Sequence, residues 1–142
     1  MSKSSSTIEI PLRFTASQHL ICEFKVNGIQ GTFLVDTGAS NSCIEKELGN
    51  KFQLQVQGET LPMTSAGNEK LSAEACQSIE LKYENHLLSH LEFMLIDMRP
   101  INAALKEQGE AAIDGILGAD VLEPQNAIIN YKNLRLILTY NP

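Results

Sequence analysis

The chain has 142 residues, enough for one hydrophobic core but too few for two ordinary domains. With 43% hydrophobic and 20% charged residues, its composition is typical of a soluble globular protein. The net charge of −6 and the lack of a basic run argue against a nucleic-acid partner, which requires clustered Lys and Arg. No apolar run is long enough to predict a membrane span, so no membrane partner is expected.

Cysteine usage and the start of the chain bear on the cellular compartment. Cys22, Cys43 and Cys76 are odd in number and widely spaced, which favours reduced thiols over a disulfide framework. No signal peptide is visible at the start, so we expect a cytoplasmic protein. His86 and His90 are four residues apart but flank a hairpin-like stretch, so we expect no metal site. No residue pattern suggests a cofactor.

The first strand is predicted after a polar tail. Residues 1–6 are rich in serine and are expected to be flexible, whereas residues 7–142 are expected to form a single domain. Alternation over Thr7–Phe14 predicts a strand. Its inward side chains would be Ile8, Ile10, Leu12 and Phe14. Pro11 has no N–H to donate to a neighbouring strand, which favours an edge position.

Two further strands flank a strong hairpin signal. His19–Val26 and Ile29–Val35 are joined by Asn27-Gly28, a dipeptide that suits a two-residue hairpin turn. The second strand stays apolar to its end, which is typical of a buried strand, and it stops at Asp36. By itself, a carboxylate at this point is most simply a turn residue.

The middle of the chain predicts short elements followed by long hairpins. Alternation and stop signals favour a strand over Asn41–Ile44, a short helix or turn over Glu45–Leu48, and a strand over Phe52–Val56. The small and polar residues 57–70 predict an exposed hairpin with its tip near Ala66-Gly67-Asn68. Strands over residues 71–83 and 87–96 follow on either side of a turn.

The last third of the chain predicts two helices and a final hairpin. Pro100 is suited to open a helix over Ile101–Gln108 that Gly109 would end, although a surface loop is the alternative. Ala119–Glu123 predicts a short helix ended by Pro124. Residues 127–131 and 134–140 would pair as a hairpin around Lys132-Asn133.

Two short motifs stand about 80 residues apart in this framework. Asp36-Thr37-Gly38-Ala39-Ser40 follows the apolar end of a strand, and Ile116-Leu117-Gly118 precedes a short helix. In these motifs the chain resembles the retropepsin-like aspartic proteases, the single-domain class typified by the retroviral proteases. The continuation Gly118-Ala119-Asp120 resembles cellular members more than retroviral ones. The resemblance implies a mainly β fold, a closed acid-protease β-barrel with one or two short helices and a flap hairpin.

The resemblance also implies roles for the motif residues. Asp36 would be catalytic, Thr37 would hydrogen-bond across a dimer axis, and Gly38 would leave the floor of the site open. Ala39 completes the motif, and Ser40 would be a donor to Asp36, unless it is an ordinary turn hydroxyl. Ile116, Leu117 and Gly118 would support the catalytic loop from the second motif. Met63, Thr64, Ser65, Ala66 and Gly67 would belong to a flap that closes over an extended peptide.

The chemistry of such a site requires two carboxylates. When two carboxylates lie close together they share a proton, so that one deprotonates a water while the other hydrogen-bonds the scissile carbonyl. The chain has one Asp-Thr-Gly, so the second carboxylate is expected from a homodimer. The expected function is therefore that of an aspartic endopeptidase acting on peptide or protein substrates. Its interface would use the Asp36 loops and, if suitable, the strand over residues 134–140.

Three alternatives stand beside this interpretation. The same fold could be a dimerisation or peptide-binding module without catalysis. Asp114 is a rival second carboxylate within the chain, although its sequence context favours a turn. Asp97 is likewise expected in a turn, and Asp120 is expected at the start of a helix, where a negative charge is favourable. A carbohydrate-active enzyme with two carboxylates is disfavoured, because aromatic residues make up 6% of the chain and Trp is absent.

Overall fold

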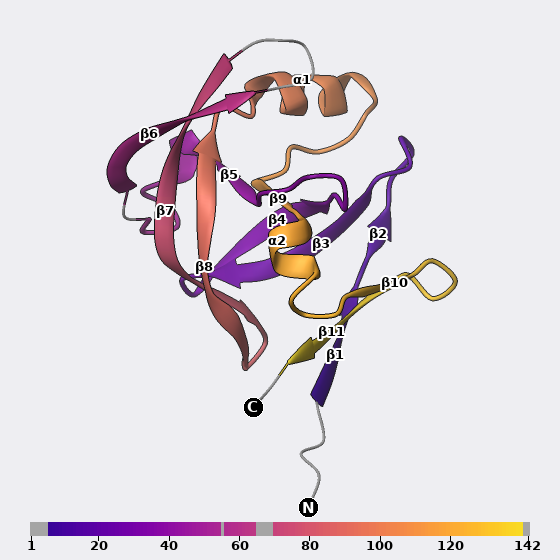
Figure 1. Ribbon diagram of the computed structural model, residues 1–142. Coiled ribbons are helices and arrows are strands. Elements are labelled where there is room, and N and C mark those ends of the chain that lie inside the picture. The colour runs from indigo at the N-terminus through magenta and orange to yellow at the C-terminus, as the bar shows by residue number, and fades with distance from the viewer. Residues whose placement is uncertain (1–5, 55, 65–69, 141–142) are drawn as a thin grey trace, which may run out of the picture.

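The computed structural model describes residues 6–54, 56–64 and 70–140, and within them the chain is mainly β-structure with two short α-helices (Figure 1). The expected mainly β fold is confirmed. The strands are β1 (Ser6–Pro11), β2 (Arg13–Phe14), β3 (Leu20–Val26), β4 (Ile29–Val35), β5 (Cys43–Glu45), β6 (Val56–Thr64), β7 (Lys70–Tyr83), β8 (His86–Ile96), β9 (Gly115–Leu117), β10 (Ile128–Asn130) and β11 (Arg135–Tyr140). The helices are the 3₁₀ turn η1 (Lys46–Leu48), α1 (Arg99–Glu107) and α2 (Ala119–Leu122).

The larger sheet places β4 near its centre. Its strand order is β2-β3-β4-β9-β5-β8-β7-β6, and an additional pairing of β3 with β7 joins the curled sheet back on itself. The β3–β4 hairpin forms as predicted, with Val26 opposite Ile29. Its turn residues Asn27 and Gly28 have φ angles of 50° and 85°, the left-handed values that a two-residue hairpin turn of this type requires.

Aromatic side chains fill the inside of the curled sheet. Phe33 of β4 contacts Phe24 and Phe93 edge to face, with ring centroids 6.3 and 6.1 Å apart, and all three rings are buried. Such edge-to-face pairs add to the burial of apolar area. The strand that ends at Asp36 is therefore anchored in the core.

Two predictions for individual segments are wrong. Phe52 does not begin a strand, because it lies in a turn in which its N–H bonds to the carbonyl of Leu48, and β6 begins only at Val56. The Phe52 ring is nevertheless fully buried, so the apolar residue that suggested a strand is instead a core side chain carried by a turn. Phe14 is 50% exposed instead of inward, and its ring meets Tyr131 edge to face. The alternation of buried and exposed side chains ends at Leu12, which lies between β1 and β2. The Leu12 N–H donates to the carbonyl of Leu134.

The helix α1 covers one face of the sheet near the end of β4 (Figure 1). It forms as the proline signal predicts, with Pro100 in its first turn and Gly109, at a φ of 78°, just after its end. Leu105 packs with Ile21 of β3 and Leu34 of β4 in a second small core. Within the described ranges, no helix is long and apolar enough to cross a membrane.

A second sheet of three strands lies at the terminal side of the molecule, in the order β1-β11-β10 (Figure 1). The predicted edge position of the Pro11 strand is confirmed, and β1 already begins at Ser6. The last strand, β11, lies between β1 and β10, and it pairs with β1 along its whole length but with β10 only over residues 135–137.

Candidate active site

Asp36 lies directly after β4, at the point where the parallel strand β9 ends beside it. Val35 pairs with Leu117, and the Asp36 N–H donates to the Leu117 carbonyl at 2.9 Å. Asp36 is half-buried, and from the described residues its carboxylate accepts one hydrogen bond, from the Gly38 N–H to Oδ1 at 2.9 Å. Thr37 is exposed. The loop thus presents one carboxylate from a rigid strand end.

The second motif contacts the loop that follows Asp36. The Ala119 N–H donates to the Ala39 carbonyl at 2.7 Å. At Gly118 a β-carbon would lie 2.6 Å from the same carbonyl oxygen, so a glycine is required there by the close approach of two backbones. The predicted partnership between Ile116-Leu117-Gly118 and the Asp36 motif therefore corresponds to direct backbone contact.

A buried serine that the sequence analysis missed completes this connection. Ser42 has no exposed surface, and its hydroxyl donates to Asp120 Oδ1 at 2.6 Å while its N–H donates to Oδ2 at 3.0 Å. The same hydroxyl accepts the Gly118 N–H at 2.9 Å. Ser40, which the resemblance suggested as a donor to Asp36, is exposed. The only signal for Ser42 was a polar residue next to an otherwise buried strand.

The carboxylates considered as rivals have partners of their own. Asp114 accepts the Thr32 N–H at 2.9 Å, and its Oδ1 lies 3.9 Å from the ammonium of Lys51. Thr32 is four residues before Asp36 on β4, which at about 3.3 Å per residue separates the two positions by roughly 13 Å. Asp120 is held by Ser42, and Asp97 by the guanidinium of Arg99. Each of the three thus has a partner other than Asp36 in the described part of the chain.

The thiol nearest to this region is not a nucleophile. Cys43 is buried in β5, and burial together with the nearby charge of Asp120 raises its pKa to about 11. Burial also raises the pKa of the Cys22 thiol. Both cysteines are therefore protonated at neutral pH, and both are free, as the sequence predicted.

The long hairpin β6–β7 occupies the place of the predicted flap. Met63 and Thr64 lie in β6, where they pair with Leu71 and Lys70 of β7. Ser65, Ala66 and Gly67, which the sequence places at or near the tip, lie outside the described residues. The strands that would carry a flap are thus present on both sides of its tip.

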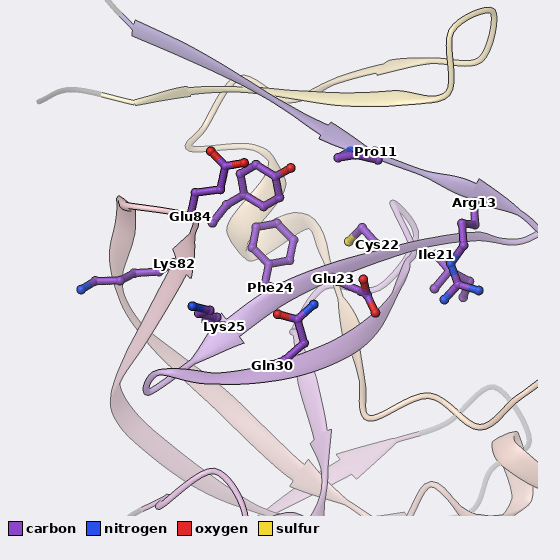
Figure 2. A pocket seen from close by; sticks show the side chains of 11 residues that line it. Pro11, Arg13, Ile21, Cys22, Glu23, Phe24, Lys25, Gln30, Lys82 and Glu84 are labelled. Carbon is purple, nitrogen blue, oxygen red and sulfur yellow. The ribbon is translucent and has the colours of Figure 1, made fainter.

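Two hollows differ in their relation to Asp36. One of about 400 Å³ borders the Asp36 loop and is lined by side chains that include Thr37, Leu122 and Ile129. The other, of about 380 Å³, lies over the hairpin half of β3 between Arg13, Glu23 and Lys82 (Figure 2). No residue of the Asp36 loop or of α2 lines that second hollow, so it is separate from the candidate active site.

Comparisons with known proteins agree with this geometry. A family model described as aspartyl protease matches residues 22–121. No curated protein matches the sequence. A retropepsin-like aspartic protease from Rickettsia conorii is similar in structure, with a TM-score of 0.60 at 20% identity over 99% of this chain and 97% of that one.

Two further solved structures share the fold. The retroviral protease-like domain of Ddi1 from Leishmania major has a TM-score of 0.60 at 18% identity, over 84% of this chain and 87% of that one. The EIAV protease, solved with the inhibitor HBY-793, has a TM-score of 0.57 at 15% identity, over 83% of this chain and 98% of that one. From the family match and the shared fold, the chain belongs to the aspartyl protease family and has the retropepsin-like architecture.

Proposed function

We propose that the protein is an aspartic endopeptidase that works as a homodimer, in which each chain contributes Asp36. The observation that carries this proposal is the placement of Asp36 at the buried end of β4, with its loop fixed by Gly118 and Ser42. The carboxylate itself is left half-buried, with one local hydrogen bond. A rigid loop that presents a free carboxylate is suited to meet a second one across a two-fold axis.

The proposed chemistry follows from the proximity of two like charges. Two Asp36 carboxylates facing each other share one proton, because two negative charges at short range repel each other strongly. The ionised member deprotonates a water, and the protonated member donates to the carbonyl oxygen of the scissile peptide. The exposed Thr37 and Gly38 then form the floor of the shared site beneath the peptide.

The proposed interface joins the Asp36 loop to the three-stranded sheet. The hollow that borders Thr37 continues to Ile129 of β10, and β10, like β1, is an edge strand of the three-stranded sheet in the described part of the chain. Ile128 on this strand is 57% exposed. Pairing of β10 with β10 of a second copy would cover this apolar side chain and bring the two Asp36 loops together.

The test compares Asp36→Asn with a matched control. Asp36→Asn keeps the size of the side chain but removes the shared proton, so peptide cleavage at mildly acidic pH should fall by roughly a hundredfold to ten-thousandfold. The mass in solution should remain that of a dimer. Asp97→Asn, the same substitution at an exposed pair with Arg99, should leave cleavage unchanged. Equal activity of wild type and Asp36→Asn would refute catalysis and favour a binding module.

Mixing wild type with Asp36→Asn tests whether both chains supply the site. If every site needs two aspartates, activity follows the square of the wild-type fraction, so an equal mixture keeps about a quarter of the activity. A catalyst complete in one chain would keep about half. Chains must exchange before the measurement, which tagged copies and mass spectrometry can verify.

A further inference from the structure

A hydrogen-bonded cluster outside the candidate active site joins two loops that are distant in the sequence. Ser17 lies in the loop between β2 and β3, and Glu110 lies just after α1. Glu110 Oε1 accepts the Ser17 N–H at 2.9 Å and also the Ser17 hydroxyl at a shorter distance. Nδ1 of His19 is 2.6 Å from the same hydroxyl. Ser17, His19 and Glu110 are called the Glu110 clamp below.

The count of hydrogens fixes the direction of each bond in the clamp. A serine hydroxyl has one hydrogen, and here it is donated to Glu110. Nδ1 of His19 must then carry a hydrogen and donate to Ser17 Oγ. Thr15 Oγ1 accepts the His19 N–H at 3.0 Å, which closes the loop on itself. The two hydrogen bonds from Ser17 lower the pKa of Glu110, and the bond from the side chain contributes more than the bond from the backbone.

The clamp is attached firmly on the side of α1. The Glu110 N–H donates to the carbonyl of Leu105, and Leu105 is buried against Ile21 and Leu34. The second carboxylate oxygen of Glu110, Oε2, is buried and accepts no hydrogen bond from the described residues. Loss of the Ser17 donors would therefore remove the two hydrogen bonds that contribute most to stabilising this partly buried carboxylate, which is unfavourable. Glu110 thus holds the Ser17 loop rather than the reverse.

The loop that the clamp holds lies at the same end of the sheet as Asp36. Leu20, the first residue of β3, pairs with Val35, the last residue of β4. Because the two strands are antiparallel, the chain enters β3 from the loop of residues 15–19 at the edge where it leaves β4 for Asp36. The register ends at this pair, so His19 directly precedes and Asp36 directly follows residues that lie opposite each other. A peptide bound at Asp36 would therefore pass along this loop.

We propose that Glu110 is a positioning residue for substrate binding, which acts by holding the loop of residues 15–19 beside Asp36 through Ser17 and His19. This inference rests on the proposed protease function. Asp36 itself is fixed independently, by the Leu117 carbonyl and by the loop contacts of Gly118. Release of the clamp therefore affects how well the peptide is bound and leaves the reacting groups in place.

The experiment compares Glu110→Ala and Glu110→Gln with Glu107→Gln, an exposed glutamate on α1 that serves as the matched control. If release of the clamp leaves the loop of residues 15–19 in its peptide-binding conformation for only about a tenth of the time, KM for an extended peptide rises about tenfold. In Glu110→Ala we expect that rise, with kcat within about twofold of wild type. Glu110→Gln retains an oxygen that can accept from Ser17, so its KM should lie between those of Glu110→Ala and wild type.

A second measurement reads the clamp without substrate. The Ser17 amide should exchange its hydrogen slowly in wild type and at least about tenfold faster in Glu110→Ala. Equal Ser17 exchange in both proteins, or equal KM in Glu110→Ala and Glu107→Gln, would refute the proposal. A parallel fall in kcat and thermal midpoint would also refute it, because the role would then be general stability. Absence of cleavage by wild type would instead refute the protease function, whatever the exchange data show.

Discussion

Gly118 provides a stringent test of how the Asp36 loop is held. Its φ is −107°, which any residue adopts, so a substitution there is opposed by space alone. A β-carbon would lie 2.6 Å from the Ala39 oxygen and 3.2 Å from the carbonyl carbons of Ala39 and Asn41. These are backbone atoms of the loop that follows Asp36. Gly118→Ala must therefore displace that loop or the start of α2.

The expected cost can be assembled from the contacts at this point. Overpacking by one methyl group in a close-packed site costs about 1–3 kcal/mol. The displacement would also weaken the Ala119–Ala39 bond and the Gly118–Ser42 bond, each worth about 1 kcal/mol net. The total is roughly 3–5 kcal/mol, a large fraction of the 5–15 kcal/mol that typically stabilises a domain. At about 3 °C per kcal/mol, the midpoint of thermal unfolding should fall by roughly 10–15 °C.

Gly49→Ala is the control for this measurement. Gly49 has a helical φ of −54°, and the nearest atom to an added β-carbon is the Lys46 oxygen at 3.7 Å, an ordinary contact. Its midpoint should change by less than about 3 °C. Both variants should be melted by calorimetry at one protein concentration, because dimerisation makes the midpoint concentration-dependent. A Gly118→Ala midpoint within about 3 °C of Gly49→Ala would refute the backbone contact.

Further predictions concern Ser42, the buried thiols and one exposed carboxylate. Ser42→Ala should lower the free energy of unfolding by about 2–4 kcal/mol in urea titrations, because a bond to the Asp120 carboxylate is lost and the Gly118 N–H loses its acceptor; a change below about 1 kcal/mol would contradict this. At pH 8, iodoacetamide should label neither Cys22 nor Cys43 in the folded protein, since burial raises both pKa values; prompt labelling of either, seen by peptide mass spectrometry, would show the burial to be wrong. Hydrogen bonds from Arg99 lower the pKa of Asp97, so this pair stabilises the fold above the ordinary carboxyl pKa of about 3.9 and ceases to do so as the pH falls through the folded value. Asp97→Asn should therefore be less stable than wild type at pH 7, with a gap that narrows below about pH 3.9; a gap that is constant with pH would contradict the assignment.

The parts of the fold that the sequence predicted correctly depend on local signals. Asn27-Gly28 adopts its hairpin because these two residues tolerate positive φ, whichever strands surround them. Pro100 and Gly109 bound α1 for equally local reasons. The Asp36 and Gly118 motifs were recognised because each combines a strand end with small residues within a few positions.

The parts that were missed depend on contacts between distant segments. Ser42 is tied to Asp120, 78 residues away, and no periodicity connects the two. The last strand pairs with β1 from the other end of the chain, so its central place in the sheet could not follow from its own alternation. At Phe52 the opposite error occurred: a buried side chain in a turn produced an alternating pattern that predicted a strand. Alternation reports burial, whereas pairing is decided by the whole chain.

Three connections between the halves of the chain surround Asp36 without using its carboxylate. The Thr32 N–H is bound by Asp114, the Ala39 carbonyl by Ala119, and Ser42 by Asp120. Each joins the Asp36 segment to residues 114–120, and each involves a backbone group. The backbone path of the loop is therefore fixed independently of its exposed side chains. Among the described residues, the Asp36 carboxylate is left with one hydrogen bond, from the Gly38 N–H of its own turn. Such rigidity is costly to build around a turn residue, but it is what a dyad needs if two carboxylates from separate chains are to meet at a distance short enough to share a proton.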